Sequence, residues 1–146
     1  MKNIYAKVVA DLMHPGHVEF FRKARALGDR LTVNVVPDSR VVLAKRRPVM
    51  STDERVELVR ACRYVDEVII DGPKVITRAF MKAGGFHIYA FGANGDDELR
   101  GKLADCADLP GEMIARIEYT AGISTTEIIG RVLRRAGVTV TDGFSS

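Results

Sequence analysis

Two histidines flank a proline and a glycine in the stretch His14-Pro15-Gly16-His17, and these residue types suit the binding of phosphate. Pro15 has the fixed backbone angle of a first helical residue, and Gly16 lets a ligand approach the backbone closely. A helix start offers unpaired N–H groups and a positive potential to an anion. Two imidazoles at this spacing can converge on that anion. A metal pair or two unrelated surface histidines are the alternatives, but two histidines alone do not complete a metal site.

A second candidate site is the segment from Gly122 to Glu127, which carries three consecutive hydroxyl residues, Ser124, Thr125 and Thr126. Ser124 and Glu127 have the spacing of a capping box, in which a hydroxyl and a carboxylate pair with otherwise unpaired backbone donors. Capping alone is therefore a sufficient explanation of these residues. The same hydroxyls after a glycine would also form a second anion cradle, and that function is compatible with capping.

The third candidate is the basic run Lys45-Arg46-Arg47. A basic run in a loop is most often simply solvated. A flexible loop that carries a lysine is also a common device for closing a cation over a triphosphate, so both interpretations stay open.

Alternating strands and helices must position these residues. We expect strands at residues 2–10, 31–36, 65–70, 86–91 and 114–117, a loop from 37 to 48, and helices at 16–28, after Ser51, at 73–83, 96–105 and 124–136. This alternation implies right-handed crossovers and a parallel sheet with helices on both faces. Such sheets bind ligands beyond the carboxyl ends of their strands, which is where His14 and His17 follow the first strand.

The composition fits one domain over residues 1–146, with a frayed tail at 141–146. The chain has 47% hydrophobic and 28% charged residues and a net charge of +3. This mild charge suits an enzyme that binds polyanionic phosphates and does not by itself indicate a nucleic-acid partner. No stretch predicts a membrane span or a signal peptide, so we expect a cytoplasmic protein. Cys62 and Cys106 lack the spacing of a zinc site or a disulfide scaffold.

Taken in order, these motifs resemble a known family. They resemble the cytidylyltransferase branch of the HxGH nucleotidyltransferases. The motifs concerned are the H-x-G-H stretch, the basic loop, Glu54-Arg55, the segment Arg63-Tyr64-Val65-Asp66-Glu67-Val68 and the run from Gly122 to Thr126. That branch includes enzymes for glycerol 3-phosphate, phosphoethanolamine and phosphocholine. The resemblance covers about residues 4 to 134 and implies a Rossmann-like doubly wound five-stranded sheet, CTP as substrate and a homodimer.

The resemblance also implies roles for individual residues. His14, His17 and Lys45 would be catalytic, while Asp11, Lys45 and Arg63 would contact the acceptor. An acceptor phosphate would attack the α-phosphorus of CTP in line and release pyrophosphate, with Mg²⁺ held mainly by the phosphates and no metal site on the protein. The implied nucleotide-binding residues are Ala10, Asp11, Gly16, His17, Gly92, Gly122, Ser124, Thr125 and Thr126.

Three segments depart from the family pattern. Val8-Val9-Ala10 replaces a Gly-Thr/Ser-Phe sequence, Tyr119-Thr120-Ala121 replaces a segment with an arginine, and Gly92-Ala93-Asn94-Gly95 replaces a G-D-D/N-W type segment. These departures suggest an unusual acceptor. Among family members the chain resembles the cytidylyltransferase domain used in fosfomycin biosynthesis, which implies 2-hydroxyethylphosphonate as the acceptor.

Other functions stay open from the sequence. Glycerol 3-phosphate or phosphoethanolamine would serve as an acceptor by the same chemistry, and an adenylyltransferase of the FAD synthase or sugar-activating type would use the same motifs. A regulatory module that binds a nucleotide without turnover is the alternative outside enzymes. A nucleic-acid-binding domain has the least support, because no aromatic residues are interleaved with the short basic run.

Overall fold

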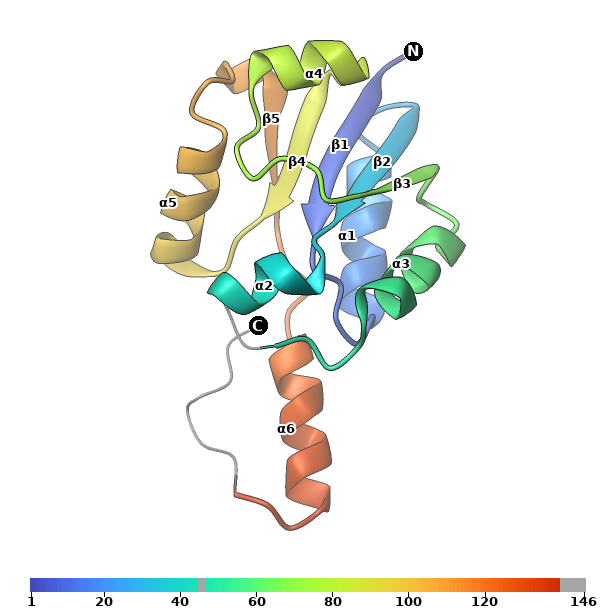
Figure 1. Cartoon of the computed structure of the whole chain (residues 1–146), viewed down its shortest axis with the longest axis vertical. Helices are drawn as coiled ribbons and strands as arrows, with labels where there is room; N and C mark the ends of the chain where they lie inside the picture. The colour runs from blue at the N-terminus through green and yellow to red at the C-terminus, as the bar shows by residue number, and fades with distance from the viewer. Residues whose placement is uncertain (45–46, 140–146) are drawn as a thin grey trace.

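Five parallel strands form the centre of the computed structural model, which describes residues 1–44 and 47–139. The strand order is β3-β2-β1-β4-β5, and every neighbouring pair is parallel. From the central β1 the chain moves outward through β2 and β3, and then in the opposite direction through β4 and β5 (Figure 1). This reversal creates the switch point at which such sheets bind ligands. The strands are β1 (Asn3–Val8), β2 (Arg30–Val35), β3 (Glu67–Ile70), β4 (Ile88–Gly92) and β5 (Ile114–Ile117).

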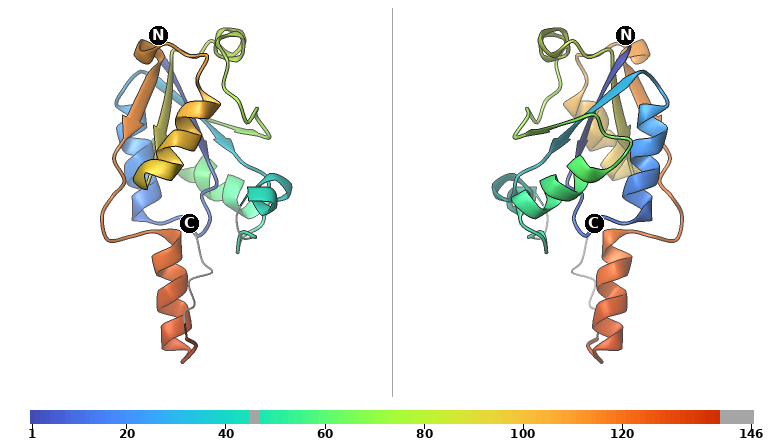
Figure 2. Two further views of the ribbon diagram at one scale, coloured as in Figure 1. Left: turned by 90° about the vertical axis from the view of Figure 1, so that its left-hand side faces the viewer. Right: turned by 90° about the vertical axis from the view of Figure 1, so that its right-hand side faces the viewer.

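Helices cover both faces of this sheet, so the predicted α/β doubly wound fold is confirmed. Figure 2 shows α1 and α4 on opposite sides of the strands. α1 and α3 share one hydrophobic core cluster with the sheet, and residues from α4 and the end of α5 share the other. The helices are α1 (Pro15–Arg25), α2 (Asp38–Ala44), α3 (Thr52–Ala61), α4 (Arg78–Gly84), α5 (Gly95–Asp105) and α6 (Thr125–Arg135), with a short 3-10 helix at Gly111–Met113.

Side chains of β1 alternate between the two core clusters. Ile4 and Ala6 pack with α1 and α3, whereas Tyr5 packs in the cluster on the α4 and α5 side. This alternation is the ordinary period of a strand. It places Lys7 on the same face as Tyr5, which matters for the site described below.

Two expected boundaries were wrong. Residues 37–48 are not all loop, because α2 begins at Asp38; the carbonyl of Pro37 accepts hydrogen bonds from Arg40 and Val41 and so starts a helical turn. The expected helix at 73–83 begins only at Arg78, where the Thr77 side chain accepts a hydrogen bond from Phe80 N. Before it, the buried Ile76 donates its backbone N–H to the Asp105 carbonyl, and residues 73–77 form no helix.

The first strand also ends earlier than expected. β1 stops at Val8, and Ala10 and Leu12 have positive φ angles of 56° and 49°, which no regular strand contains. These two left-handed residues turn the chain sharply from β1 into α1. The predicted tail at 141–146 lies outside the described residues. Within the described part of the chain, none of the helices is long and apolar enough to cross a bilayer.

Candidate active site

A cavity of about 640 Å³ lies at the carboxyl ends of β1 and β4. Its walls come from the turn between β1 and α1, the loop after β4 and the segment between β5 and α6. Figure 1 shows α6 below the sheet at this end. The cavity therefore lies where the parallel sheet predicts a ligand. The expected site residues that line it are Ala10, Asp11, His14, Gly16, His17, Gly92, Gly122, Ser124 and Thr125.

The histidine turn forms a helix cap from its own imidazoles. Nδ1 of His14 accepts a hydrogen bond from Gly16 N at 3.0 Å, and Nδ1 of His17 accepts one from His14 N at 3.2 Å. A Cβ atom at position 16 would lie 2.7 Å from Cε1 of His14, so only glycine lets the imidazole fold back over the helix start. The sequence H-x-G-H is thus explained locally by the capping geometry.

This capping fixes the tautomer of both histidines. Because each Nδ1 is an acceptor, the neutral ring carries its proton on Nε2, which remains a hydrogen-bond donor. Burial is the main reason that the pKa of His17 is lowered to about 4, and the neighbouring His14 adds to this shift while Asp11 opposes it. Burial also lowers the pKa of His14. At neutral pH the turn therefore contributes two uncharged imidazoles, each with an Nε2–H group, to a cavity beside a helix start.

The start of α6 forms the second part of the cavity. Gly122 has a φ of +83°, a conformation that favours glycine, and Ser124 Oγ accepts a hydrogen bond from Glu127 N at 3.0 Å. The Ser124 half of the predicted capping box is thus confirmed, whereas the Glu127 carboxylate accepts from Arg131 and Arg134 instead. The Thr125 hydroxyl donates to the Asp11 carbonyl at 2.8 Å, which joins α6 to the β1–α1 turn. Thr126 does not line the cavity, and its hydroxyl is buried without a hydrogen-bond partner in the described part of the chain.

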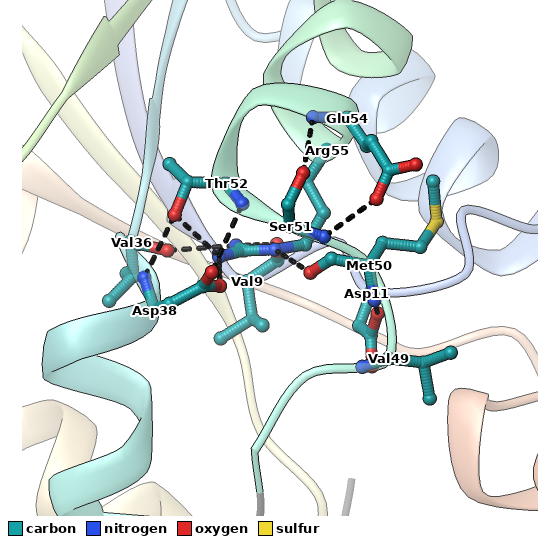
Figure 3. Close-up of polar contacts among 10 residues, drawn as sticks. All are labelled: Val9, Asp11, Val36, Asp38, Val49, Met50, Ser51, Thr52, Glu54 and Arg55. Atoms are coloured by element: carbon teal, nitrogen blue, oxygen red, sulfur yellow. Dashed lines mark hydrogen bonds and ion pairs between the residues drawn. The ribbon is translucent and has the colours of Figure 1, made fainter.

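Asp11 anchors the segment that follows the basic run. Its two carboxylate oxygens accept hydrogen bonds from the backbone N–H groups of Val49 and Met50, both at 2.9 Å (Figure 3). Pro48, just before them, lines the cavity. The carboxylate thus brings this segment to the cavity edge, and its expected contact with an acceptor stays a prediction. Lys45 lies outside the described residues, so its catalytic role also stays a prediction.

Behind this anchor, Arg55 is completely buried and joins three segments near the cavity (Figure 3). Its Nη1 donates to the carbonyl oxygens of Val9 and Val36 at 2.7 and 2.8 Å, after β1 and β2 respectively. Its Nε donates to Met50 O at 3.2 Å, and its Nη2 donates to the Asp38 carboxylate at 2.6 Å. This guanidinium holds the pKa of Asp38 below its ordinary value. Sequence reasoning identified Arg55 only as part of a motif, and did not predict its burial.

Arg63, expected at the acceptor, lies elsewhere. It is exposed and lines a shallow surface hollow with Tyr64 and Leu58, beside the outer side of His14. Its guanidinium lies 5.9 Å from the centre of the Tyr64 ring. The structure therefore does not bring Arg63 into the cavity with the other expected residues.

Several residues of the cavity were not identified from the sequence. Tyr119 lies over Gly92, where a Cβ atom would come within 2.6 Å of its ring, so the glycine is required for the tyrosine to stay there. Lys7 and Lys102 line the cavity from β1 and α5. Strand alternation alone could have placed Lys7 on one face of the sheet, but nothing local indicates that Lys102 meets the same cavity.

Comparison with known proteins agrees with this geometry. A family model described as cytidylyltransferase-like matches residues 9–131. The chain is 36% identical over 133 residues to a probable ethanolamine-phosphate cytidylyltransferase of Encephalitozoon cuniculi, covering 91% of the chain and 41% of that protein. It is 39% identical over 137 residues to the ethanolamine-phosphate cytidylyltransferase of Arabidopsis thaliana, covering 89% of the chain and 32% of the relative. The chain thus spans less than half the length of these two relatives.

A third relative is similar in length. The FAD synthase of Thermococcus kodakarensis is 42% identical over 137 residues, with 86% of this chain and 87% of that protein covered. Among solved structures, a lipopolysaccharide core biosynthesis protein from Thermoplasma volcanium superposes with a TM-score of 0.60 at 24% identity, covering 82% of this chain and 97% of that one. This last likeness supports the fold.

Proposed function

This chain belongs to the cytidylyltransferase-like family, and from that premise we propose that it transfers CMP from CTP to a small phosphate-bearing acceptor and releases pyrophosphate. The observation that carries the proposal is the cavity in which the His14–His17 turn and the start of α6 meet. Both are helix starts, whose positive potential favours an anionic ligand. At α1 the first backbone N–H group, that of Gly16, already bonds to His14 Nδ1, so the imidazole Nε2–H groups are the donors there. The Thr125–Asp11 hydrogen bond holds the two helix starts together. A site with two helix starts suits a ligand with several phosphates.

The arrangement suits in-line attack on the α-phosphorus. An acceptor phosphate is already ionised near neutral pH, so the reaction needs no strong general base. The protein must instead align two anions that repel each other and stabilise the charge that develops at the α-phosphorus. The Nε2–H groups of His14 and His17 supply fixed donors for that charge, and they are neutral before the nucleotide binds.

We propose Mg²⁺ as the cofactor, carried by the phosphates of the nucleotide. The described residues hold no group of three or more side chains that could bind a metal ion. The two acidic side chains of the cavity wall, Asp11 and Glu127, are engaged by backbone N–H groups and by Arg131 and Arg134. Phosphate oxygens with few protein ligands are a usual setting for Mg²⁺, which supplies positive charge to the leaving pyrophosphate.

The names of the relatives bear on the acceptor. Two are named for ethanolamine phosphate, which supports a phosphate monoester over the 2-hydroxyethylphosphonate expected from the resemblance. The match to an FAD synthase of nearly equal length supports a second candidate, transfer of AMP from ATP to FMN. The same two helix starts would hold either triphosphate.

A nucleotide-by-acceptor screen for pyrophosphate release tests the proposal. CTP and ATP are each combined with Mg²⁺ and with phosphoethanolamine, glycerol 3-phosphate, 2-hydroxyethylphosphonate or FMN. We expect CTP with a phosphate monoester to release pyrophosphate in proportion to the adduct formed. ATP with FMN as the productive pair would favour the second candidate. Tight nucleotide binding without release for any acceptor would show a binding module instead.

We also propose a homodimer. The hollow around Arg63 and Tyr64 includes Leu58, an exposed large hydrophobic residue, and lies directly beside His14. A second subunit covering this hollow would shield the outer side of the histidine turn. Light scattering that gave the mass of one chain would remove the proposal.

A further inference from the structure

Four charged side chains lie on the described part of the cavity wall. Lys7 and Lys102 line it as cations, and Asp11 and Glu127 line it as anions. Asp11 accepts two backbone hydrogen bonds, and Glu127 accepts from Arg131 at 3.4 Å and Arg134 at 3.2 Å. Both carboxylates on this part of the wall are therefore already engaged by donors of the protein.

Lys7 is an unusual lysine because its side chain is only 9% exposed. Its Nζ donates to the carbonyl of Lys74 at 3.0 Å and lies 3.9 Å from the carboxylate of Asp105, beyond hydrogen-bonding distance. Asp105 itself is not part of the cavity wall. An ammonium group has three donors, and a buried one is stabilised by an anionic partner.

The electrostatic surroundings agree. Burial is the main reason that the pKa of Lys7 is lowered to about 8, and Lys102, Arg40 and Lys74 add to this shift while Asp105 opposes it. The ammonium is therefore held in its charged form at neutral pH at some cost, and a bound anion would offset that cost. Among the described residues of the cavity wall, the lysines are Lys7 and Lys102.

We propose that Lys7, assisted by Lys102, forms a subsite for a second anionic group of the acceptor, so that the preferred acceptor carries a carboxylate in addition to the phosphate that attacks CTP. The inference rests on the proposed function, because it takes this cavity as the place where the acceptor binds. The subsite lies on the α4 and α5 side of the sheet, apart from the histidine turn at the start of α1. An acceptor with a positively charged amine would meet two lysines there.

Binding measurements test this without turnover. Isothermal titration calorimetry compares 2-phosphoglycolate with phosphoethanolamine, in the presence of Mg²⁺ and cytidine 5′-(α,β-methylene)triphosphate. A charge-assisted contact corresponds to about tenfold or more in affinity. We expect 2-phosphoglycolate to bind wild-type protein about tenfold more tightly than phosphoethanolamine does, and we expect Lys7→Met to abolish this preference. Lys82→Met, on exposed α4, is the control and should keep it.

Each other outcome is decisive. Equal or stronger binding of phosphoethanolamine by wild-type protein overturns the proposal, as does a preference that survives in Lys7→Met. Weaker binding of the CTP analogue alone in Lys7→Met would assign the lysine to the nucleotide and also overturn it. If Lys7→Met fails to fold, the same comparison is made with Lys102→Met. A weaker preference for 2-phosphoglycolate than in wild-type protein then supports the proposal, and an unchanged preference overturns it.

The same probes separate this inference from the proposed function. Pyrophosphate release that is fastest with phosphoethanolamine would leave the nucleotidyl transfer intact and remove the carboxylate subsite. A clear binding preference for 2-phosphoglycolate, with no pyrophosphate from any nucleotide and acceptor, would leave the subsite intact and remove the transfer reaction.

Discussion

The hydroxyl of Thr125 donates a 2.8 Å hydrogen bond to the main-chain carbonyl of Asp11. These residues are 114 positions apart, and the bond is buried. Asp11 leads into the histidine turn at the start of α1, and Thr125 is the first residue of α6. One hydrogen bond therefore fixes the relative positions of the two helix starts that would bind the triphosphate.

Replacing Thr125 with valine keeps the shape of the side chain and removes this bond. The Asp11 carbonyl would be left buried without its partner, so we expect a loss of about 1 kcal/mol in the free energy of unfolding. The KM for CTP should rise severalfold, because the two helix starts lose their common anchor. Urea unfolding and steady-state kinetics measure both effects. Thr126→Val is the matched stability control, because its buried hydroxyl makes no hydrogen bond in the described structure and its removal should cost no stability.

Substitutions of the histidines can separate the capping role of Nδ1 from the donor role of the Nε2–H group. In His14→Asn the amide oxygen can replace Nδ1 and accept from Gly16 N, but nothing replaces the Nε2–H group. We expect this variant to melt near the wild-type temperature and to lose about a hundredfold in kcat, since one missing transition-state donor has roughly that effect. His17→Ala should fold and lose at least as much. Wild-type turnover in either variant would exclude the proposed role of that imidazole.

Burial of His17 makes stability depend on pH. Its pKa is lowered from 6.5 to about 4 in the folded protein, so below about pH 6.5 the unfolded chain takes up a proton that the folded chain does not. The free energy of unfolding should therefore fall as the pH falls from 6.5 toward 4. His17→Asn keeps an acceptor for His14 N but does not titrate. As the pH falls through this interval, the free energy of unfolding of His17→Asn should rise relative to that of wild type. If the two free energies instead change in parallel with pH, His17 has an ordinary pKa.

The hydrogen bonds of Arg55 should contribute strongly to the stability of the protein. Arg55→Lys keeps a charge but cannot reach Val9, Val36 and Asp38 together, so buried acceptors lose their donor. We expect a loss of about 3 kcal/mol in unfolding free energy, as for a broken buried network. Arg60→Lys, on the exposed side of the same helix, is the control and should change stability little. Equal effects of the two substitutions would contradict the structural role of Arg55.

Much of this arrangement was predictable because its causes are local. Val33 and Val35 lie in a strand rich in β-branched residues, and the cap at Ser51 and Glu54 is a contact between residues three apart. The histidine turn was predictable for the same reason, since Gly16 and the two imidazoles bond within one helical turn. The parallel sheet then follows from the alternation of strands and helices.

The rest depends on contacts between distant segments. Lys7 and Lys102 meet one cavity only because β1 and α5 are brought together by the sheet order. Arg55 lies in a helix whose sequence gives no sign that an arginine is buried, because its partners are carbonyl groups from other loops. α2 was missed because a proline and an aspartate favour a loop as readily as a helix start.

The most direct measurement is ³¹P NMR of the wild-type protein with CTP, Mg²⁺ and a phosphate monoester. If the cavity transfers CMP, the acceptor phosphorus and the α-phosphorus of CTP will appear in a new diphosphate diester while pyrophosphate accumulates in equal amount. His17→Ala should form the same product at least about a hundred times more slowly. CDP with inorganic phosphate, CMP without an adduct, or unchanged CTP with every acceptor would contradict the proposed reaction.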